Sequence, residues 1–171
     1  MTHVSNPPTN SAETRDAIWR PDVTVATVVP RDGRFLIVEE VSDARLVLNQ
    51  PAGHLEPLES LADAAVRETL EETGWRVALT GLVGIYQWHR PVDDFHVLRV
   101  AFAAEPVNHD PAQPLDHGIV RALWLTRDEI AAQATRHRSP LVLRNIDDFL
   151  AGKLHPLDAL QSLLPATESR R

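Results

Sequence analysis

The sequence predicts an α/β fold, a sandwich built around a mixed β-sheet, on two observations. Runs of β-branched and apolar residues recur along most of the chain, and only a small number of helical patterns fall between them, without regular alternation. This irregular order favours a mixed sheet covered by helices over a regular alternation of parallel strands and crossover helices. The chain has 171 residues, so we expect a single domain over residues 1–171 with its core at about 21–152.

The first strands are predicted from β-branched runs that end at turn residues. Residues 23–29 read Val-Thr-Val-Ala-Thr-Val-Val and are followed by a proline. The turn sequence Arg-Asp-Gly-Arg at 31–34 precedes a second apolar run at 35–38, so the two runs are expected to pair as a hairpin. A shorter apolar run at 46–48 leads into the breaker-rich loop 49–53.

Helical patterns begin after that loop. Residues 60–73 form the first long one, and Gly74 is expected to end it as the residue after the last turn. A later helix at 141–150 is preceded by Ser139 and Pro140, which suit the N-cap and the first helical position. The remaining expected elements are strands at 76–88, 97–104 and 120–125 and a helix near 126–132.

Composition excludes several classes of function. The formal net charge of −7 argues against a basic groove for nucleic acid or a surface for anionic lipid. Because the chain has no cysteine, disulfides, thiol catalysis and cysteine-ligated metals are excluded. Lys153 is the only lysine and belongs to no glycine-rich loop, which disfavours a P-loop or a Schiff-base enzyme.

The two ends of the chain are polar. Residues 1–17 are rich in Pro, Asn and Ser and contain no apolar stretch, and residues 166–171 are mostly polar, so both ends are expected to be mobile. The sequence has no run of about 18 apolar residues, the length that a membrane-spanning helix needs. We therefore expect a soluble cytoplasmic protein, a monomer or homodimer, that binds neither membrane nor nucleic acid.

Three carboxylates share one face of the expected 60–73 helix. Glu68, Glu71 and Glu72 fall within one sector of about 100°, beside an apolar stripe. Like charges at these spacings destabilise an isolated helix by a few tenths of a kcal/mol each. A solvated surface is the ordinary explanation of such a cluster. The alternative is a divalent cation site, because Mg²⁺ prefers oxygen ligands together with substrate phosphates, and surplus carboxylates suit two or more ions.

The residues around this cluster favour the cation site. Gly53, Glu59, Arg67-Glu68, Glu71-Glu72 and Gly74 follow one another with gaps of five, seven, two and one residues. From average residue usage, chance agreement at every one of these positions is on the order of one in a million. The residues match the catalytic box of the Nudix family, which the chain therefore resembles. The family consensus has aliphatic residues at the positions of Thr69 and Trp75, a difference that concerns packing.

The resemblance to the Nudix family implies a fold and a site. The fold would be an α/β/α sandwich in which the box forms a loop, a helix and a loop. The activity would be hydrolysis of a diphosphate linked to another moiety, with Mg²⁺ or Mn²⁺. The metal ligands would be Glu68, Glu71, Glu72 and the carbonyl of Ala52, with Glu56 in or next to the shell. Glu68 or a neighbour would activate the attacking water, and Arg67 would orient the glutamates by pairing with Glu59.

Further segments resemble a group of bacterial Nudix phosphatases, most tellingly Pro-Ala-Gly-His-Leu-Glu at residues 51–56. This resemblance implies release of single orthophosphates from nucleoside tri- and diphosphates and action on hydroxymethylpyrimidine pyrophosphate. One alternative is a pyrophosphohydrolase that splits a nucleoside triphosphate between its α and β phosphates or cuts a nucleotide sugar. Another, from a different class, is a regulatory module that binds a nucleotide without cleaving it, although such a module would be expected to lose the box carboxylates.

Aromatic and histidine side chains are candidates for binding the substrate. Tyr86, Trp88 and His89 lie close together in an expected strand, and they would either stack on a base or pack in the core. His54 follows the first box glycine and would either reach a phosphate or stay solvated in its loop.

Charged residues outside the box are the remaining candidates. Arg90 and Arg138 would clamp a phosphate through their forked donors, or lie on a solvated surface. Asp93, Asp94 and Asp116 lie in expected loops, where one of them would add a distant acid to the site or all would simply shape turns.

Overall fold

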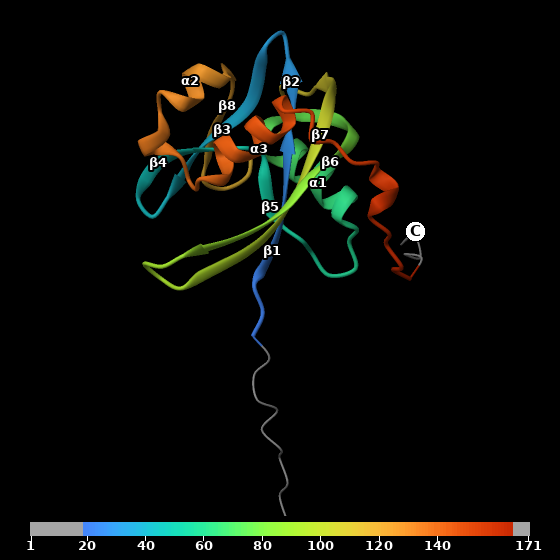
Figure 1. Ribbon diagram of the computed structural model, residues 1–171. Coiled ribbons are helices and arrows are strands. Elements are labelled where there is room, and N and C mark those ends of the chain that lie inside the picture. Colours follow the sequence, from blue (N-terminus) through green and yellow to red (C-terminus); the bar gives the residue numbers. More distant parts are fainter. Residues whose placement is uncertain (1–18, 166–171) are drawn as a thin grey trace, which may run out of the picture.

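The computed structural model describes residues 19–165 (Figure 1). Its strands are β1 (Asp22–Val28), β2 (Pro30–Arg31), β3 (Arg34–Ser42), β4 (Arg45–Asn49), β5 (Ala52–His54), β6 (Trp75–Arg90), β7 (Phe95–His109) and β8 (Ile119–Thr126). Its helices are α1 (Leu61–Thr73), α2 (Arg127–Ala131) and α3 (Leu141–Leu150), with 3-10 turns η1 (Ala134–Arg136) and η2 (Leu157–Ala159). The ends expected to be mobile, 1–17 and 166–171, lie outside the described residues.

The strands form two sheets. The first has the order β5-β1-β7-β6 and is mixed, because β1 runs parallel to β7 while β5 and β6 pair antiparallel with their neighbours. The second is antiparallel and centres on β3, which pairs with β2 and β4 along one edge and with β8 along the other. The predicted α/β class with a mixed sheet is therefore confirmed.

The predicted hairpin between residues 23–29 and 35–38 is wrong for its first strand. β1 pairs with β5 and β7, and only the two residues of β2 fold back on the start of β3. The chain changes sheet at Val29, whose carbonyl accepts a hydrogen bond from the Leu36 N–H at 3.0 Å. The physical reason is that β1 is buried from Thr24 to its end, which suits an interior strand covered on both faces rather than a surface hairpin.

Helices cover both faces of the mixed sheet. Along β7, Val100 and Phe102 point to one face and Ala101 and Ala103 to the other, because side chains alternate along a strand. The first face packs against α1 through Ala64 and Ala65. The second face packs against α2 and α3 through Ile130, Val142 and Ile146. This layering is the α/β/α sandwich that the family resemblance implies.

Helix α1 begins and ends where the sequence predicts. The Ser60 hydroxyl accepts from the Asp63 N–H at 3.0 Å as N-cap, and Gly74, at φ 71°, takes the left-handed conformation that ends the helix. Helix α3 is assigned from Leu141, with Pro140 as the residue before it. Pro140 already has helical dihedrals, and the Ser139 hydroxyl accepts from the Leu141 N–H at 3.2 Å, which is the capping contact expected of Ser139.

The other differences from the sequence-based elements are in their lengths. Strand β5 overlaps the end of the predicted loop 49–53. Strands β6 and β7 run further than predicted because their ends form a long two-stranded ribbon (Figure 1). The two 3-10 turns were not predicted. Over residues 19–165, no helix is both long enough and apolar enough to cross a bilayer.

Candidate active site

Helix α1 presents the box carboxylates because the neighbouring side of the helix is locked to the sheet. Thr69 is fully buried, and its hydroxyl lies 2.8 Å from that of Thr27 on β1. Thr69 also donates to the carbonyl of Ala65 at 2.7 Å, which satisfies a hydroxyl that would be costly to bury alone. The threonine at this position thus fixes the rotation of α1 through a hydrogen bond.

Arg67 ties the box acids together. Its guanidinium donates from Nε and Nη2 to the two carboxylate oxygens of Glu59 at 2.7 and 2.8 Å. Nη1 donates to Glu68 at 2.7 Å and to Glu71 at 2.9 Å, and Nη2 also donates to the carbonyl of His54 at 3.1 Å. The guanidinium holds the pKa of the Glu59 carboxyl below its usual value. A single guanidinium therefore contacts three carboxylates, and its contact with Glu59 is the pairing that the family resemblance implies.

Strand β5 brings its backbone against α1. The Ala52 N–H donates to Glu72 Oε2 at 2.8 Å. Pro51 and Leu55 bond to β1 through the Thr27 N–H and the Val23 carbonyl, both at 3.0 Å. Because backbone groups alternate in direction along a strand, the carbonyl of Ala52 points to the same side as its N–H, away from β1 and toward the carboxylates.

Gly53 makes room for Glu68. A methyl group at Gly53 would lie 2.1 Å from Glu68 Cδ and 2.2 Å from each carboxylate oxygen. The glycine of the box is therefore required for the close approach of this carboxylate to the backbone of β5.

An acidic cluster joins α1 to a distant loop. Glu68, Glu71 and Asp116 each offer a carboxylate oxygen, and these oxygens lie within 4.8 Å of one another. The Asp116 N–H donates to the Glu71 carbonyl at 3.0 Å, which holds the loop before β8 against the helix. Asp116 is thus the one of the three candidate distant acids that the fold brings to the box. Glu72 does not belong to this group of three.

The electrostatics of these acids fit a divalent cation. Burial raises the pKa of Glu68, although Arg67 opposes the shift. Burial also raises the pKa of Glu72 to about 9, with the charges of Glu40, Glu68 and Asp116 adding to the effect and the Ala52 N–H opposing it. Buried carboxylates this close need more positive charge than Arg67 supplies, and oxygen-only ligands suit Mg²⁺ or Mn²⁺.

A cavity of about 320 Å³ opens beside the cluster. Its walls come from α1, from both sheets and from the loop before α3. The residues that line it include Glu40, Glu68, Glu72, Trp88, Arg99, Asp116 and Arg138. A single space therefore contains box carboxylates, an aromatic ring and guanidinium groups.

Arg99 is a residue of this cavity that the sequence analysis missed. It is 7% exposed, and its Nε and Nη1 make only long hydrogen bonds, to the Thr24 hydroxyl at 3.3 Å and the Asn49 side-chain oxygen at 3.5 Å. Among residues 19–165, no carboxylate lies within 4.0 Å of this guanidinium. Burial, followed by the charge of Arg138, lowers the pKa of Arg99 to about 10. The available signal was an arginine in the middle of an otherwise apolar strand.

Glu40 faces the same cavity from the second sheet. Its Oε2 accepts from Arg138 at 3.1 Å, while its Oε1 is enclosed without a hydrogen-bond partner among the described residues. Arg138 is therefore an ion-pair partner of Glu40 as well as a wall of the cavity.

The structure separates the other predicted substrate contacts. Trp88 and His54 line the cavity, and the His54 side chain is 68% exposed at its rim. Tyr86 lies on the same face of β6 as Trp88 but beneath α3, where its hydroxyl donates to Asp148 at 3.1 Å and it packs on the core. The packing alternative therefore describes Tyr86. His89 points to the opposite face of the ribbon, stacked on His96.

The remaining charged candidates lie at the edge of the cavity. Glu56 is exposed at the rim, and its backbone N–H donates to Glu59 at 3.2 Å. Arg90 lines the cavity but donates twice to Asp93, at 2.8 and 2.6 Å. Asp94 accepts from His89 and His96 instead of joining the box.

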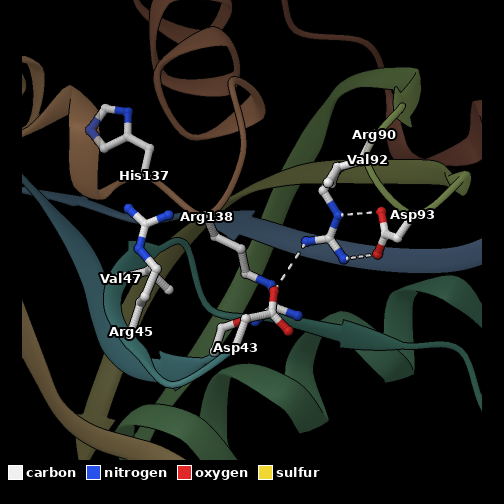
Figure 2. A pocket seen from close by; sticks show the side chains of 9 residues that line it. Asp43, Arg45, Val47, Arg90, Val92, Asp93, His137 and Arg138 are labelled. Carbon is white, nitrogen blue, oxygen red and sulfur yellow. Dashed lines mark hydrogen bonds and ion pairs between the residues drawn. The ribbon is translucent and has the colours of Figure 1, made fainter.

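A second cavity of about 430 Å³ adjoins the first. Figure 2 shows Arg90 between Asp93 and Asp43, on the side opposite Arg45 and His137. Arg90 and Arg138 line both cavities and form the boundary between them. Although this cavity is larger, none of the box carboxylates lines it, so the candidate active site is the smaller one.

Comparison with known proteins gives one consistent answer. A family model for the NUDIX domain matches residues 18–145. The chain is 41% identical over 143 residues to phosphatase NudJ of Escherichia coli strain K12, covering 84% of this chain and 92% of that protein.

Solved structures agree with these matches. A NUDIX hydrolase from Nitrosomonas europaea is 48% identical with a TM-score of 0.82, covering 84% of this chain and 97% of that one. A MutT NUDIX hydrolase from Burkholderia pseudomallei, 18% identical with a TM-score of 0.66 and coverages of 76% and 98%, shares the fold. With the box geometry of α1, these similarities show that the chain belongs to the Nudix family and is a Nudix hydrolase.

Proposed function

We propose that this Nudix hydrolase releases orthophosphate from nucleoside tri- and diphosphates and from hydroxymethylpyrimidine pyrophosphate, using two or more Mg²⁺ or Mn²⁺ ions. The observation that carries the proposal is the convergence of Glu68, Glu71 and Asp116 within 4.8 Å of one another beside a cavity large enough for a small phosphorylated molecule. The similarity to phosphatase NudJ supports release of orthophosphate as the outcome.

The chain's own residues would divide the work. Glu68, Glu71, Asp116, Glu72 and the carbonyl of Ala52 would hold the cations, while Glu56, exposed at the rim, would contribute at most through water. The bound ions would neutralise phosphate oxygens and lower the pKa of the attacking water.

Proton transfer and orientation would fall to the box. Glu68 or a neighbour would accept a proton from the attacking water. Glu72, which lines the cavity with Glu68, is such a neighbour. Arg67 would keep Glu68 and Glu71 in place through its two Nη1 hydrogen bonds.

The rest of the substrate would lie across the mixed sheet. From β5, the strand order leads over β1 and β7 to β6, so Arg99 lies between the carboxylates and Trp88. Arg99 would donate to an acceptor on the substrate, Trp88 would stack on its ring, and Arg138, Arg90 and His54 would contact the outer phosphates or the rim.

A substrate panel with Mg²⁺ tests the proposal. Nucleoside tri- and diphosphates, nucleotide sugars and hydroxymethylpyrimidine pyrophosphate are incubated with the full chain, and orthophosphate, pyrophosphate and nucleoside monophosphate are measured. We expect orthophosphate as the released product. Release of pyrophosphate would identify a pyrophosphohydrolase instead. Release of nucleoside monophosphate from nucleotide sugars would identify a nucleotide-sugar hydrolase. Tight binding without turnover would identify a regulatory module.

Calorimetry tests the metal part separately. Mg²⁺ and Mn²⁺ are titrated into the chain with and without a nucleotide. Binding is expected in wild type and weaker binding in Glu71→Gln, and no heat of binding in wild type under either condition would overturn the metal assignment.

We also propose that the protein acts on small molecules in the cytoplasm, as a monomer or homodimer, without nucleic acid. The net charge of −7 supports the part of this proposal that concerns nucleic acid, because a negative surface repels the phosphate backbone. Light scattering after size exclusion measures the oligomeric state, and cell fractionation measures the location.

A further inference from the structure

Two histidines face each other across the β6–β7 ribbon, away from the active site. His89 and His96 are register partners on neighbouring antiparallel strands, so their side chains leave the ribbon on the same face. The residues of β6 that line the cavity are Trp88 and Arg90, which stand on either side of His89 in the strand. Because side chains alternate between the two faces along a strand, the histidines lie on the face away from the cavity. The ribbon extends from the body of the molecule toward the lower left of Figure 1.

The two imidazoles converge on a single carboxylate oxygen. His89 Nε2 lies 2.9 Å and His96 Nε2 lies 3.1 Å from Asp94 Oδ1. The rings are stacked, with centroids 4.1 Å apart and an interplanar angle of 11°. All three potential ligand atoms lie within 4.8 Å of one another.

These spacings match those around a bound transition-metal ion. An ion about 2.0–2.2 Å from histidine nitrogen and carboxylate oxygen keeps neighbouring ligand atoms roughly 2.9–3.4 Å apart, from octahedral to tetrahedral geometry. The two nitrogen–oxygen distances of 2.9 and 3.1 Å lie in this range. Because the two rings are stacked nearly parallel, they must turn toward each other for both Nε2 lone pairs to point at one ion.

The chemistry and surroundings of the cluster separate it from the box. Two nitrogens and one oxygen suit Zn²⁺, Ni²⁺ or Cu²⁺, whereas the oxygen-only box suits Mg²⁺ or Mn²⁺. The Asp94 side chain is 85% exposed, which leaves an open path for an ion and for a water ligand. The His96 side chain is 26% exposed, and the Trp19 ring packs edge-on against it with centroids 5.0 Å apart, which limits its motion.

We propose that His89, Asp94 and His96 form a second metal site, one that binds a late first-row divalent ion such as Zn²⁺ and links the strands β6 and β7. Its ligands are separate from the box carboxylates and take no part in the hydrolytic step. Because Phe95, between two of the ligands, lines the catalytic cavity from the other face, a bound ion stiffens the wall of that cavity.

Zinc titration calorimetry of the full chain in excess Mg²⁺ tests the site. Wild type is expected to bind one equivalent of Zn²⁺ that the double variant His89→Gln/His96→Gln does not bind. Asp94→Asn is expected to lower the affinity at least about tenfold, since even losing a partner that only orients a ligand costs 10–100-fold. His155→Gln, at an exposed histidine outside the ribbon, is the matched control and should bind as wild type does. Full Zn²⁺ binding by the double variant would overturn the proposal.

Nitrogen NMR of the histidine rings gives a second, independent readout. Adding Zn²⁺ in excess Mg²⁺ is expected to shift the Nε2 signals of two histidines, which the single variants His89→Gln and His96→Gln assign to positions 89 and 96. Unshifted signals at these two histidines, or the same shifts with Mg²⁺ alone, would contradict the site.

Discussion

Glu68 and Gly53 illustrate how one residue depends on another within the box. The carboxylate of Glu68 occupies the space that any side chain at position 53 would need. A methyl group at position 53 would meet only the far end of the flexible Glu68 side chain. The side chain can move aside without disturbing the fold, but its carboxylate is then displaced.

We expect Gly53→Ala to lower turnover at least about a hundredfold, because the methyl group displaces Glu68 from the cation site. The melting temperature should change little. Gly33→Ala should give the opposite result. No described atom lies within 4 Å of the added carbon, so the variant should keep its activity. Because residue 33 has φ 73°, the variant should lose about 1 kcal/mol of stability. Steady-state kinetics and thermal melts measure both, and an active Gly53→Ala would contradict the role of this glycine.

The charge of Glu72 is expected to lower the stability of the fold although the site needs it. With its folded pKa raised to about 9 and an unfolded value near 4.3, the chain without cations loses stability as pH rises through this interval, because the unfolded state then binds fewer protons than the folded state.

Glu72→Gln should therefore leave the melting temperature in EDTA at pH 8 unchanged or higher, while turnover falls at least about a hundredfold. The amide oxygen can still accept from the Ala52 N–H. A melting temperature well below that of wild type in EDTA, or normal turnover, would contradict this account.

At the scale of elements, an ion-pair cluster fastens the second sheet. Glu39 on β3 is 3% exposed, and it is the register partner of Arg121 on β8, whose Nε donates to it at 2.7 Å. Arg136, in η1, donates to the other carboxylate oxygen. The hydrogen bond from Arg121, with that from Arg136, lowers the pKa of Glu39 despite its burial.

Glu39→Gln should lower the free energy of unfolding by about 2 kcal/mol at pH 7. This is less than the loss expected from breaking a fully buried ion pair, because the Arg121 side chain is 61% exposed. A lowered folded pKa adds stability above the unfolded value near 4.3, and this stability is lost as pH falls through the folded value. Urea unfolding should therefore show a smaller difference at pH 3. Glu105→Gln, at an exposed position on β7, is the control, and a difference independent of pH would exclude the ionic origin.

At the scale of the whole molecule, the candidate active site is built from α1 and from both sheets. Helix α1 supplies Glu68 and Glu72, the mixed sheet supplies Arg99 and Trp88, and the second sheet supplies Glu40. A buried guanidinium without a carboxylate partner destabilises a fold unless a ligand pairs with it.

Arg99→Gln should raise KM at least about tenfold with little change in kcat, because a hydrogen bond to a charged donor is worth about 1.5–3 kcal/mol. The melting temperature of the substrate-free chain should be unchanged or higher, since the variant removes an unpaired buried charge. Arg76→Gln, exposed on β6, is the control. An unchanged KM would show that Arg99 does not contact the substrate.

The sequence by itself determined the family, the helix α1 with its caps, and the face shared by Glu68, Glu71 and Glu72. These features are local, because the spacing of residues along a helix sets their direction whatever surrounds it. Only the tertiary structure decided that Asp116 rather than Asp93 or Asp94 joins the box, that β1 leaves the expected hairpin, and that Arg99 faces the cavity. Those outcomes depend on which distant strands pair, and long-range pairing is set by the packing of both faces of a sheet, which no local periodicity encodes.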